Sequence, residues 1–298
     1  MDFCRLPLIE LCEAVMDALA YNYAYSEQRE WQSTLCACAL TCRAWRARAQ
    51  HVLWSSPRLV GEQRLILFIS GLRTAPSSIT TTLILAGRSH NKKLDLARAG
   101  ELFVRPFPHL RRLICDDVRF DRGPNARILR MRLPFFDSLT ALELWDCSFT
   151  SLRAMMDVVW ACQNLASLKV LGVDPVHNPD GEAPRASPAT SWLYAVATSR
   201  SLPGTLKKID LTQSHAAKSN EAWCDEVVGR GEEVDDAELP LPGLLSGLEE
   251  LRIRLNDSCD PGECAAYIHK ALPSMGEVLH LWYGGSTGQW TDYQSPLE

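Results

Sequence analysis

The chain has 298 residues, of which 46% are hydrophobic and 22% are charged, and its formal net charge is -5. This length suggests one or two domains, and the composition is that of a globular protein rather than a disordered one. The negative net charge gives no chain-wide electrostatic reason to bind nucleic acid or an anionic membrane, so we expect neither as a partner.

The first predicted element is a helix that carries Leu11, Val15 and Leu19 on one face, each four residues after the last. A second helical stripe follows in residues 35–52, and we expect it to be broken once. Its members recur at intervals of three and four residues: Leu35, Cys38, Cys42, Trp45, Ala49 and Val52. Two or three short helices bury too little apolar surface to be stable alone, so we expect this module to share an apolar face with something else.

Several short motifs in this region follow one another in a recognisable order. Leu6-Pro7 precedes Glu10-Leu11, and a Leu-rich stretch ends in Cys42-Arg43-x-Trp45-Arg46, followed by Leu53-Trp54. This order resembles the F-box family. Segment 21–33 is longer than the equivalent segment of most family members.

The resemblance implies binding to a Skp-type adaptor, which links F-box proteins to a cullin ubiquitin ligase. We expect residues 1–57 to form this adaptor-binding module. The residues that match adaptor-binding positions, or the small core behind them, are Leu6, Pro7, Leu11, Val15, Leu19, Leu40 and Trp45. The alternative is an ordinary helical subdomain that packs on its own chain.

Beyond Pro57 the hydrophobic pattern changes, and we expect a second domain over residues 58–298. A helix is predicted first, by apolar residues at helical spacing between positions 65 and 72. One phrase then recurs, and it is complete in residues 139–149, at the offsets of a leucine-rich repeat: Leu139, Leu142, Leu144, Cys147 and Phe149. Weaker copies begin at residues 80, 110, 165, 206, 248 and 276.

Alternate residues of a short strand point to the same side, so each copy can bury its Leu side chains only against the next copy. We therefore expect stacked parallel strands with return helices outside them, such as residues 151–163. This pattern resembles the degenerate leucine-rich repeats of F-box proteins. The predicted class is α/β, with an N-terminal helical F-box followed by an irregular solenoid, and a mixed α/β domain of another topology is the alternative.

Two of the separations between copies are long and contain irregular sequence. Residues 174–191 are rich in Pro, Asp, Ser and Ala, and residues 229–242 carry an acidic run framed by Gly and Pro. We expect both to be inserted loops.

The repeat register also predicts which side chains lie on the open face of the sheet. If the Leu residues of each LxL pair point into the core, the residues between and after them form two outward columns. The first column is Ile84, Ile114, Glu143, Lys169, Asp210, Arg252 and His280, and the second is Ala86, Asp116, Trp145, Leu171, Thr212, Arg254 and Trp282. Trp and Arg dominate binding hot spots, so we predict that a target protein binds Trp145, Leu171, Arg252, Arg254 and Trp282. The alternative is that a loop or a terminus covers these side chains.

Two patterns resemble a catalytic motif and a metal site, but each lacks the further residues that such a site needs. Residues 284–288 spell the GxSxG motif of hydrolases, yet no acid-His pair follows it in the remaining sequence. Cys36, Cys38 and Cys42 lie inside an apolar stripe, where Cys behaves as a small hydrophobe, and no second ligand pair accompanies them. We therefore expect no catalytic residue, no metal and no cofactor.

An arginine-rich segment over residues 105–132 has two interpretations. It carries Arg105, Arg111, Arg112, Arg119, Arg122, Arg127, Arg130 and Arg132 against Asp116, Asp117 and Asp121. One interpretation is a patch for an acidic or phosphorylated partner, and the other is a solvated face with local ion pairs.

The eleven cysteines are too sparse for a disulfide scaffold, and residues 1–20 interrupt their apolar stretch with Glu10, Glu13 and Asp17, unlike a signal peptide. We expect free thiols in the cytosol or nucleus. The function predicted is that of a substrate-recognition subunit of a cullin-type (SCF) ubiquitin ligase, not an enzyme itself. The alternative is a leucine-rich-repeat scaffold that binds a protein without any ligase.

Overall fold

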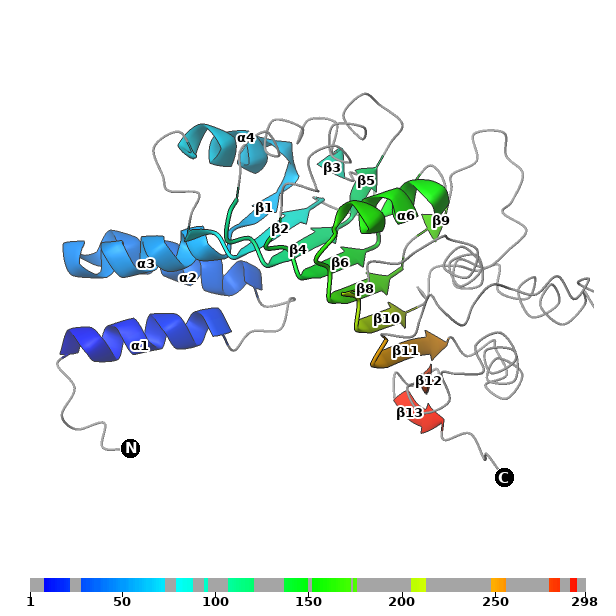
Figure 1. Cartoon of the computed structure of the whole chain (residues 1–298). Coiled ribbons are helices and arrows are strands. Elements are labelled where there is room, and N and C mark those ends of the chain that lie inside the picture. Colours follow the sequence, from blue (N-terminus) through cyan, green and yellow to red (C-terminus); the bar gives the residue numbers. More distant parts are fainter. Residues whose placement is uncertain are drawn as a thin grey trace, which may run out of the picture.

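The computed structural model describes residues 8–21, 28–72, 79–87, 94–95, 107–120, 137–149, 152–172, 174–175, 205–212, 248–255, 279–284 and 290–293. A bundle of helices at the amino end is followed by a long, mostly parallel sheet (Figure 1). The predicted mixed α/β class is therefore confirmed.

The bundle consists of α1 (Leu8–Tyr21), α2 (Gln28–Thr41) and α3 (Arg43–Ser55). The single break predicted in the second stripe falls at Cys42, whose extended backbone (φ -154°, ψ 166°) separates α2 from α3. Helix α2 begins at Gln28, so the second half of the segment 21–33 is helical rather than a loop. The core of the bundle comes from all three helices: Met16, Trp31, Leu35, Ala49 and Val52.

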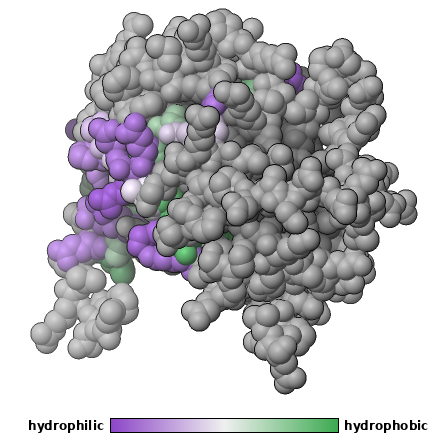
Figure 2. Space-filling model, turned by 45° about the vertical axis from the view of Figure 1, so that its right-hand side comes forward, coloured by the Kyte–Doolittle hydropathy of each residue, from purple (hydrophilic) through white to green (hydrophobic). Residues whose placement is uncertain are grey.

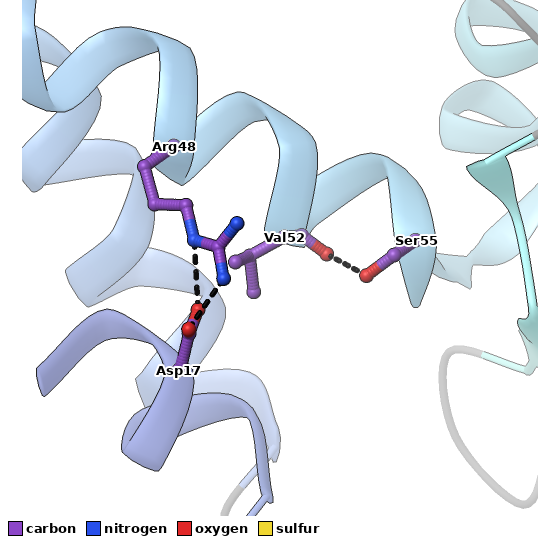
Figure 3. A network of polar contacts seen from close by, with 4 residues as sticks. All are labelled: Asp17, Arg48, Val52 and Ser55. Carbon is purple, nitrogen blue, oxygen red and sulfur yellow. Dashed lines mark hydrogen bonds and ion pairs between the residues drawn. The ribbon is translucent and has the colours of Figure 1, made fainter. Parts of the chain in front are cut away.

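A forked ion pair joins the first helix to the third. The guanidinium of Arg48 on α3 donates both from Nε (2.9 Å) and from a terminal nitrogen to the carboxylate of Asp17 on α1 (Figure 3). The hydrogen bond to Asp17 raises the pKa of Arg48. Since both side chains are 36% exposed, we expect the pair to orient α1 more than to stabilise the bundle.

Within the described residues, the main sheet has nine strands in the order β1-β2-β4-β6-β8-β10-β11-β12-β13. Their bounds are β1 (Arg58–Val60), β2 (Thr82–Ala86), β4 (Arg112–Asp116), β6 (Ala141–Trp145), β8 (Ser167–Leu171), β10 (Lys208–Thr212), β11 (Glu250–Leu255), β12 (Leu279–Gly284) and β13 (Trp290–Tyr293). All neighbours pair parallel except β12 and β13, which are antiparallel. Each of the seven predicted copies contains a strand, from β2 to β12, whereas β1 and β13 were not predicted.

Apolar side chains at equivalent positions form the core under this sheet. The first residue of each copy is buried wherever the structure describes it: Thr80, Leu110, Leu139, Leu165, Leu206 and Leu248. Both residues of the LxL pair are buried in β6, where Leu142 and Leu144 have no exposed surface. Burial of one such side chain is worth about 1.5–3 kcal/mol, so stacking the strands supplies the main stabilisation of this domain.

The chain also forms a second, smaller parallel sheet, and each of its strands comes after a strand of the main sheet in the sequence. It consists of β3 (Leu94–Asp95), β5 (Val118–Phe120), β7 (Ser148–Phe149) and β9 (Asp174–Pro175). The turns that lead from one sheet to the other use left-handed residues, Asp117 (φ 55°), Asp146 (φ 48°) and Gly172 (φ 59°). Strand β9 corrects the predicted loop 174–191, whose first two residues pair with β7. The rest of that loop and residues 229–242 lie outside the described residues.

The helices predicted by the apolar spacing in residues 61–71 and 151–163 are confirmed. Helix α4 (Gly61–Gly71) lies beside β1 (Figure 1) and β3 and buries Leu65 and Phe68. Helix α6 (Leu152–Ala161) lies beside β7 and buries Met155 and Val159. None of the described helices is both long and apolar enough to span a membrane.

Hydrogen bonds tie the end of the bundle to the start of the sheet. The hydroxyl of Thr80 donates to the carbonyl of Trp54 (2.9 Å), and the amide of Thr81 donates to the carbonyl of Ser55 (2.9 Å). The ring of Trp54 stacks on Phe68 of α4 with 5.1 Å between centroids. The carbonyl groups of Trp54 and Ser55, in the last turn of α3, thus accept hydrogen bonds from residues just before β2. These bonds fix the direction of α3 relative to the strands.

Candidate protein-binding surfaces

The bundle exposes large apolar side chains although its own core is filled. Val15 is 53% exposed, Leu40 is 80% exposed and Leu11 is 37% exposed. Leu11 and Val15 lie four residues apart on α1, so they share one side of that helix. In the view of Figure 2 the described surface is mainly hydrophilic, with a few hydrophobic areas between the polar ones.

Helix α1 turns a different face inward from the one its leucine spacing suggests. Met16 is the buried residue, at 2% exposure, and the neighbouring Asp17 binds Arg48 of α3. Because successive helical residues are rotated by about 100°, burying Met16 turns Leu11 and Val15 away from the core. The sequence left open whether these residues bind a partner or form the core, and the structure places them outside the core.

The remaining predicted adaptor-binding residues have different positions. Trp45 is half-buried and packs against the bundle core, so part of its ring remains accessible. Leu19 belongs to α1, but its side chain is outside the described residues, as are Leu6 and Pro7. Trp31 was missed as a core residue, although it lies four residues before Leu35 and extends the same stripe.

The second surface is the open face of the main sheet, and the predicted register is confirmed along its whole length. Ile84, Ile114, Glu143, Lys169, Asp210, Arg252 and His280 are partners on successive strands, and so are Ala86, Asp116, Trp145, Leu171, Thr212, Arg254 and Trp282. Both predicted columns therefore run across neighbouring strands.

Exposure along these columns increases from the bundle end onward. The expectation that every member faces solvent is wrong for four of them, because Ile84 (1%), Ile114 (3%), Ala86 (0%) and Glu143 (8%) are buried. Lys169 and Asp210 are half-buried, whereas Arg252 is exposed. The first members of the columns with an accessible apolar side chain are therefore Trp145 on β6 and Leu171 on β8.

Trp145 and Leu171 form the apolar part of the accessible face. They are direct partners on β6 and β8, and both are half-buried. The ammonium of Lys169 lies 5.1 Å from the centroid of the Trp145 ring, within the range of a cation–π contact. Arg254 and Trp282 occupy their predicted register positions, but their side chains are outside the described residues.

Ion pairs join charged side chains of this face, most of them between strands. Arg112 donates from Nε to Glu143 (2.7 Å), and Arg58 lies 3.9 Å from Asp116. The carboxylate of Glu250 contacts two cations, Lys208 (3.1 Å) and Arg252. Burial by itself would raise the pKa of Glu250, but the hydrogen bonds from Lys208 and Arg252 outweigh it and lower that pKa.

The structure bears on the hydrolase-like motif at residues 284–288 and on the three cysteines considered as metal ligands. Strand β12 ends at Gly284, and an antiparallel strand, β13, begins at Trp290. A nucleophile elbow requires a helix after the motif, so this arrangement does not fit one. Cys36 and Cys42 are exposed and Cys38 is half-buried, and no group of three metal-binding side chains is found among the described residues.

The buried thiols lie under the sheet. Burial raises the pKa of Cys162 to about 12 and that of Cys115 well above its usual value. Both are therefore protonated at neutral pH and act as small apolar side chains. Of the arginine-rich segment, the structure describes Arg111, Arg112 and Arg119, and all three are exposed.

Comparisons with known proteins add no relative to this description. No protein-family model matches the sequence, and no curated protein matches it. A functional assignment therefore depends on the two surfaces, one on the bundle and one on the sheet.

Proposed function

We propose that this protein is a substrate-recognition subunit of a cullin-type (SCF) ubiquitin ligase. The bundle is an F-box that binds a Skp-type adaptor, and the sheet is an irregular leucine-rich-repeat solenoid that binds a target protein. The observation that carries the proposal is that the bundle exposes Leu11, Val15 and Leu40 while Met16, Trp31 and Leu35 fill its own core. These exposed residues are among those that match the F-box pattern.

A physical argument supports a partner at the bundle. Covering a large aliphatic side chain is worth about 1.5–3 kcal/mol, so leaving several uncovered on a small module favours association with a second protein. The core behind them is closed, and α3 is fixed to the sheet by Thr80 and Thr81. A partner on the bundle would therefore meet a preformed surface, which lowers the entropic cost of binding.

The mechanism requires no bond-making by this chain. An adaptor bound to the bundle and a target bound to the sheet are held together, which raises the local concentration of target lysines near a ubiquitin-loaded enzyme. The effect depends on a fixed geometry between the two sites. The contacts between α3 and the first strands of the sheet provide it. This activity would take place in the cytosol or the nucleus.

Co-purification of a Skp-type adaptor with the full chain tests the proposal. Val15→Asp combined with Leu40→Asp should reduce adaptor recovery at least about tenfold, because each change places a charge in a surface that must be desolvated. The matched control is Leu67→Asp, since Leu67 is 66% exposed on α4, outside the bundle. Circular dichroism would verify that each variant is folded.

Two results would contradict the proposal. If the double variant keeps the adaptor, the bundle surface is not the binding site. If the unmodified chain binds no Skp-type adaptor, a scaffold without a ligase becomes the better account. The full chain is used because the end of α3 bonds to the sheet, and residues 1–57 alone would lose those contacts.

A further inference from the structure

Lys169 on β8 belongs to the open face of the sheet. Among the described side chains of this face, it is a lysine that forms no ion pair. The other described cations of this face each contact a carboxylate: Arg58 with Asp116, Arg112 with Glu143, and Lys208 and Arg252 with Glu250. Lys169 instead places its ammonium 5.1 Å from the centroid of the Trp145 ring. The face therefore holds a cation that is free to pair with an incoming anion.

The carboxylates that flank Lys169 in its column, those of Glu143 and Asp210, each contact another side chain. Glu143 on β6 accepts a hydrogen bond from Nε of Arg112 (2.7 Å), and Asp210 on β10 is 3.4 Å from the hydroxyl of Thr212. A half-exposed cation–π contact is worth only about 0.5–1 kcal/mol. Lys169 can therefore turn from the ring to a ligand at little cost.

Two apolar side chains lie beside Lys169 on the same face of the sheet. Trp145 and Leu171 are direct partners across β6 and β8, two residues further along these strands than the Glu143–Lys169 pair and on the same face, and they are half-buried. An aromatic ring next to an aliphatic side chain offers a flat surface on which a large apolar side chain can pack. A cation and an apolar surface are thus presented together.

The arginines of this face indicate which kind of anion Lys169 would bind. Phosphate groups are recognised best by the two-pronged guanidinium of Arg, whereas a single Lys acts as a point charge. The guanidinium groups of Arg58, Arg112 and Arg252 already contact Asp or Glu. This favours a carboxylate over a phosphate as the ligand of Lys169.

We propose that the surface formed by Trp145, Lys169 and Leu171 binds a protein segment in which an Asp or Glu lies next to a large apolar residue. The carboxylate pairs with Lys169, and the apolar side chain packs on Trp145 and Leu171. This inference rests on the proposed function of the sheet as the target-binding surface, and it names the chemical class of segment that the target presents.

The test is selection of peptides from a phage-displayed random library on the immobilised full chain. Peptides recovered on the unmodified protein should be enriched in Asp or Glu adjacent to Leu, Ile, Phe or Trp. On the Lys169→Glu variant the enriched charge should change to Lys or Arg. The matched control is Arg111→Glu, an equal change of charge at an exposed residue that precedes β4, which should leave the selection unaltered.

Affinities of one selected peptide, measured by fluorescence anisotropy, complete the test. Lys169→Glu and Trp145→Ala should each weaken binding at least about tenfold. The proposal is overturned if no peptide is enriched, if enrichment ignores charge, or if Lys169→Glu leaves it unchanged. It is also overturned if a phosphoserine in place of the acidic residue binds more tightly. Adaptor recovery by Lys169→Glu, which should equal that of the unmodified chain, is scored separately, so failure of this inference is distinguishable from failure of the proposed function.

Discussion

Leu144 illustrates how much one side chain in the stacked core contributes. It has no exposed surface, and its strand partners are Cys115 on β4 and Val170 on β8. Leu144→Ala removes buried methyl groups and leaves a cavity, so we expect the free energy of unfolding to fall by about 2–5 kcal/mol. Leu67→Ala, at a residue 66% exposed, should change it by less than about 0.5 kcal/mol. Urea unfolding measures both, and similar losses for the two variants would contradict the buried position of Leu144.

Glu250 gives a pH-dependent prediction at the same scale. Its pKa is lowered in the folded protein, so the carboxylate stabilises the fold above its unfolded pKa near 4.5, and this contribution is lost as the pH falls through the folded pKa. Glu250→Gln should therefore reduce the free energy of unfolding at pH 7, by up to about 1 kcal/mol, and make little difference near pH 3.

Glu249 provides the control for this prediction. It pairs with Lys207, but both side chains are more than half exposed, at 56% and 55%. Glu249→Gln should therefore have a smaller effect at pH 7, because solvent screens an exposed pair. An equal loss for Glu250→Gln at pH 3 and pH 7 would show that its pairs with Lys208 and Arg252 do not stabilise the protein.

At the scale of the elements, the junction between α3 and β2 joins the helical bundle to the sheet, so we expect its disruption to destabilise both. Thr80 is fully buried, and its hydroxyl donates to Trp54 (2.9 Å), whereas Thr81 is exposed and its hydroxyl makes a longer bond to Ser55 (3.3 Å). Thr80→Val should cost about 1–3 kcal/mol, because it leaves the Trp54 carbonyl without this donor. Thr81→Val should cost less.

Hydrogen exchange would locate the effect of these two variants. With Thr80→Val we expect faster exchange of amides in the last turn of α3, near Trp54, and in β2. Faster exchange confined to β2, with α3 unchanged, would mean that the junction does not couple the two elements.

Much of the sheet could be predicted because its strands obey a simple period. The recurrence of Leu at alternating positions specifies which residues face inward, and a shift of one residue would expose all of them. That is why the column from Ile84 to His280 was predicted correctly in register. Short strands without such a pattern, β1 and the members of the small sheet, carry no equivalent signal.

Packing between segments far apart in sequence decides what periodicity alone leaves open or gets wrong. Helix α1 has two possible apolar sides, and contact with α3 selects Met16 and Asp17 rather than Leu11 and Val15. Ile84 and Ile114 lie in an outward column by register, yet they are buried. Periodicity gives the side of an element on which a residue lies, but not what covers that side.

At the scale of the whole molecule, the two candidate surfaces belong to different parts of the structure. Figure 1 shows the bundle beyond β1, with the remaining strands stacked away from it toward β13. Trp145 and Leu171 lie on β6 and β8, several strands from the bundle. A partner on α1 and a partner on Trp145 could therefore be bound at the same time, as a receptor that joins a target to a ligase requires.

Hydrogen exchange of the full chain, alone and with a purified Skp-type adaptor, tests the central claim most directly. We predict that the adaptor slows exchange in α1 and α2, which carry Leu11, Val15 and Leu40, and leaves β6 to β10 unchanged. Absence of any protection in the bundle, or protection confined to the sheet, would contradict the account.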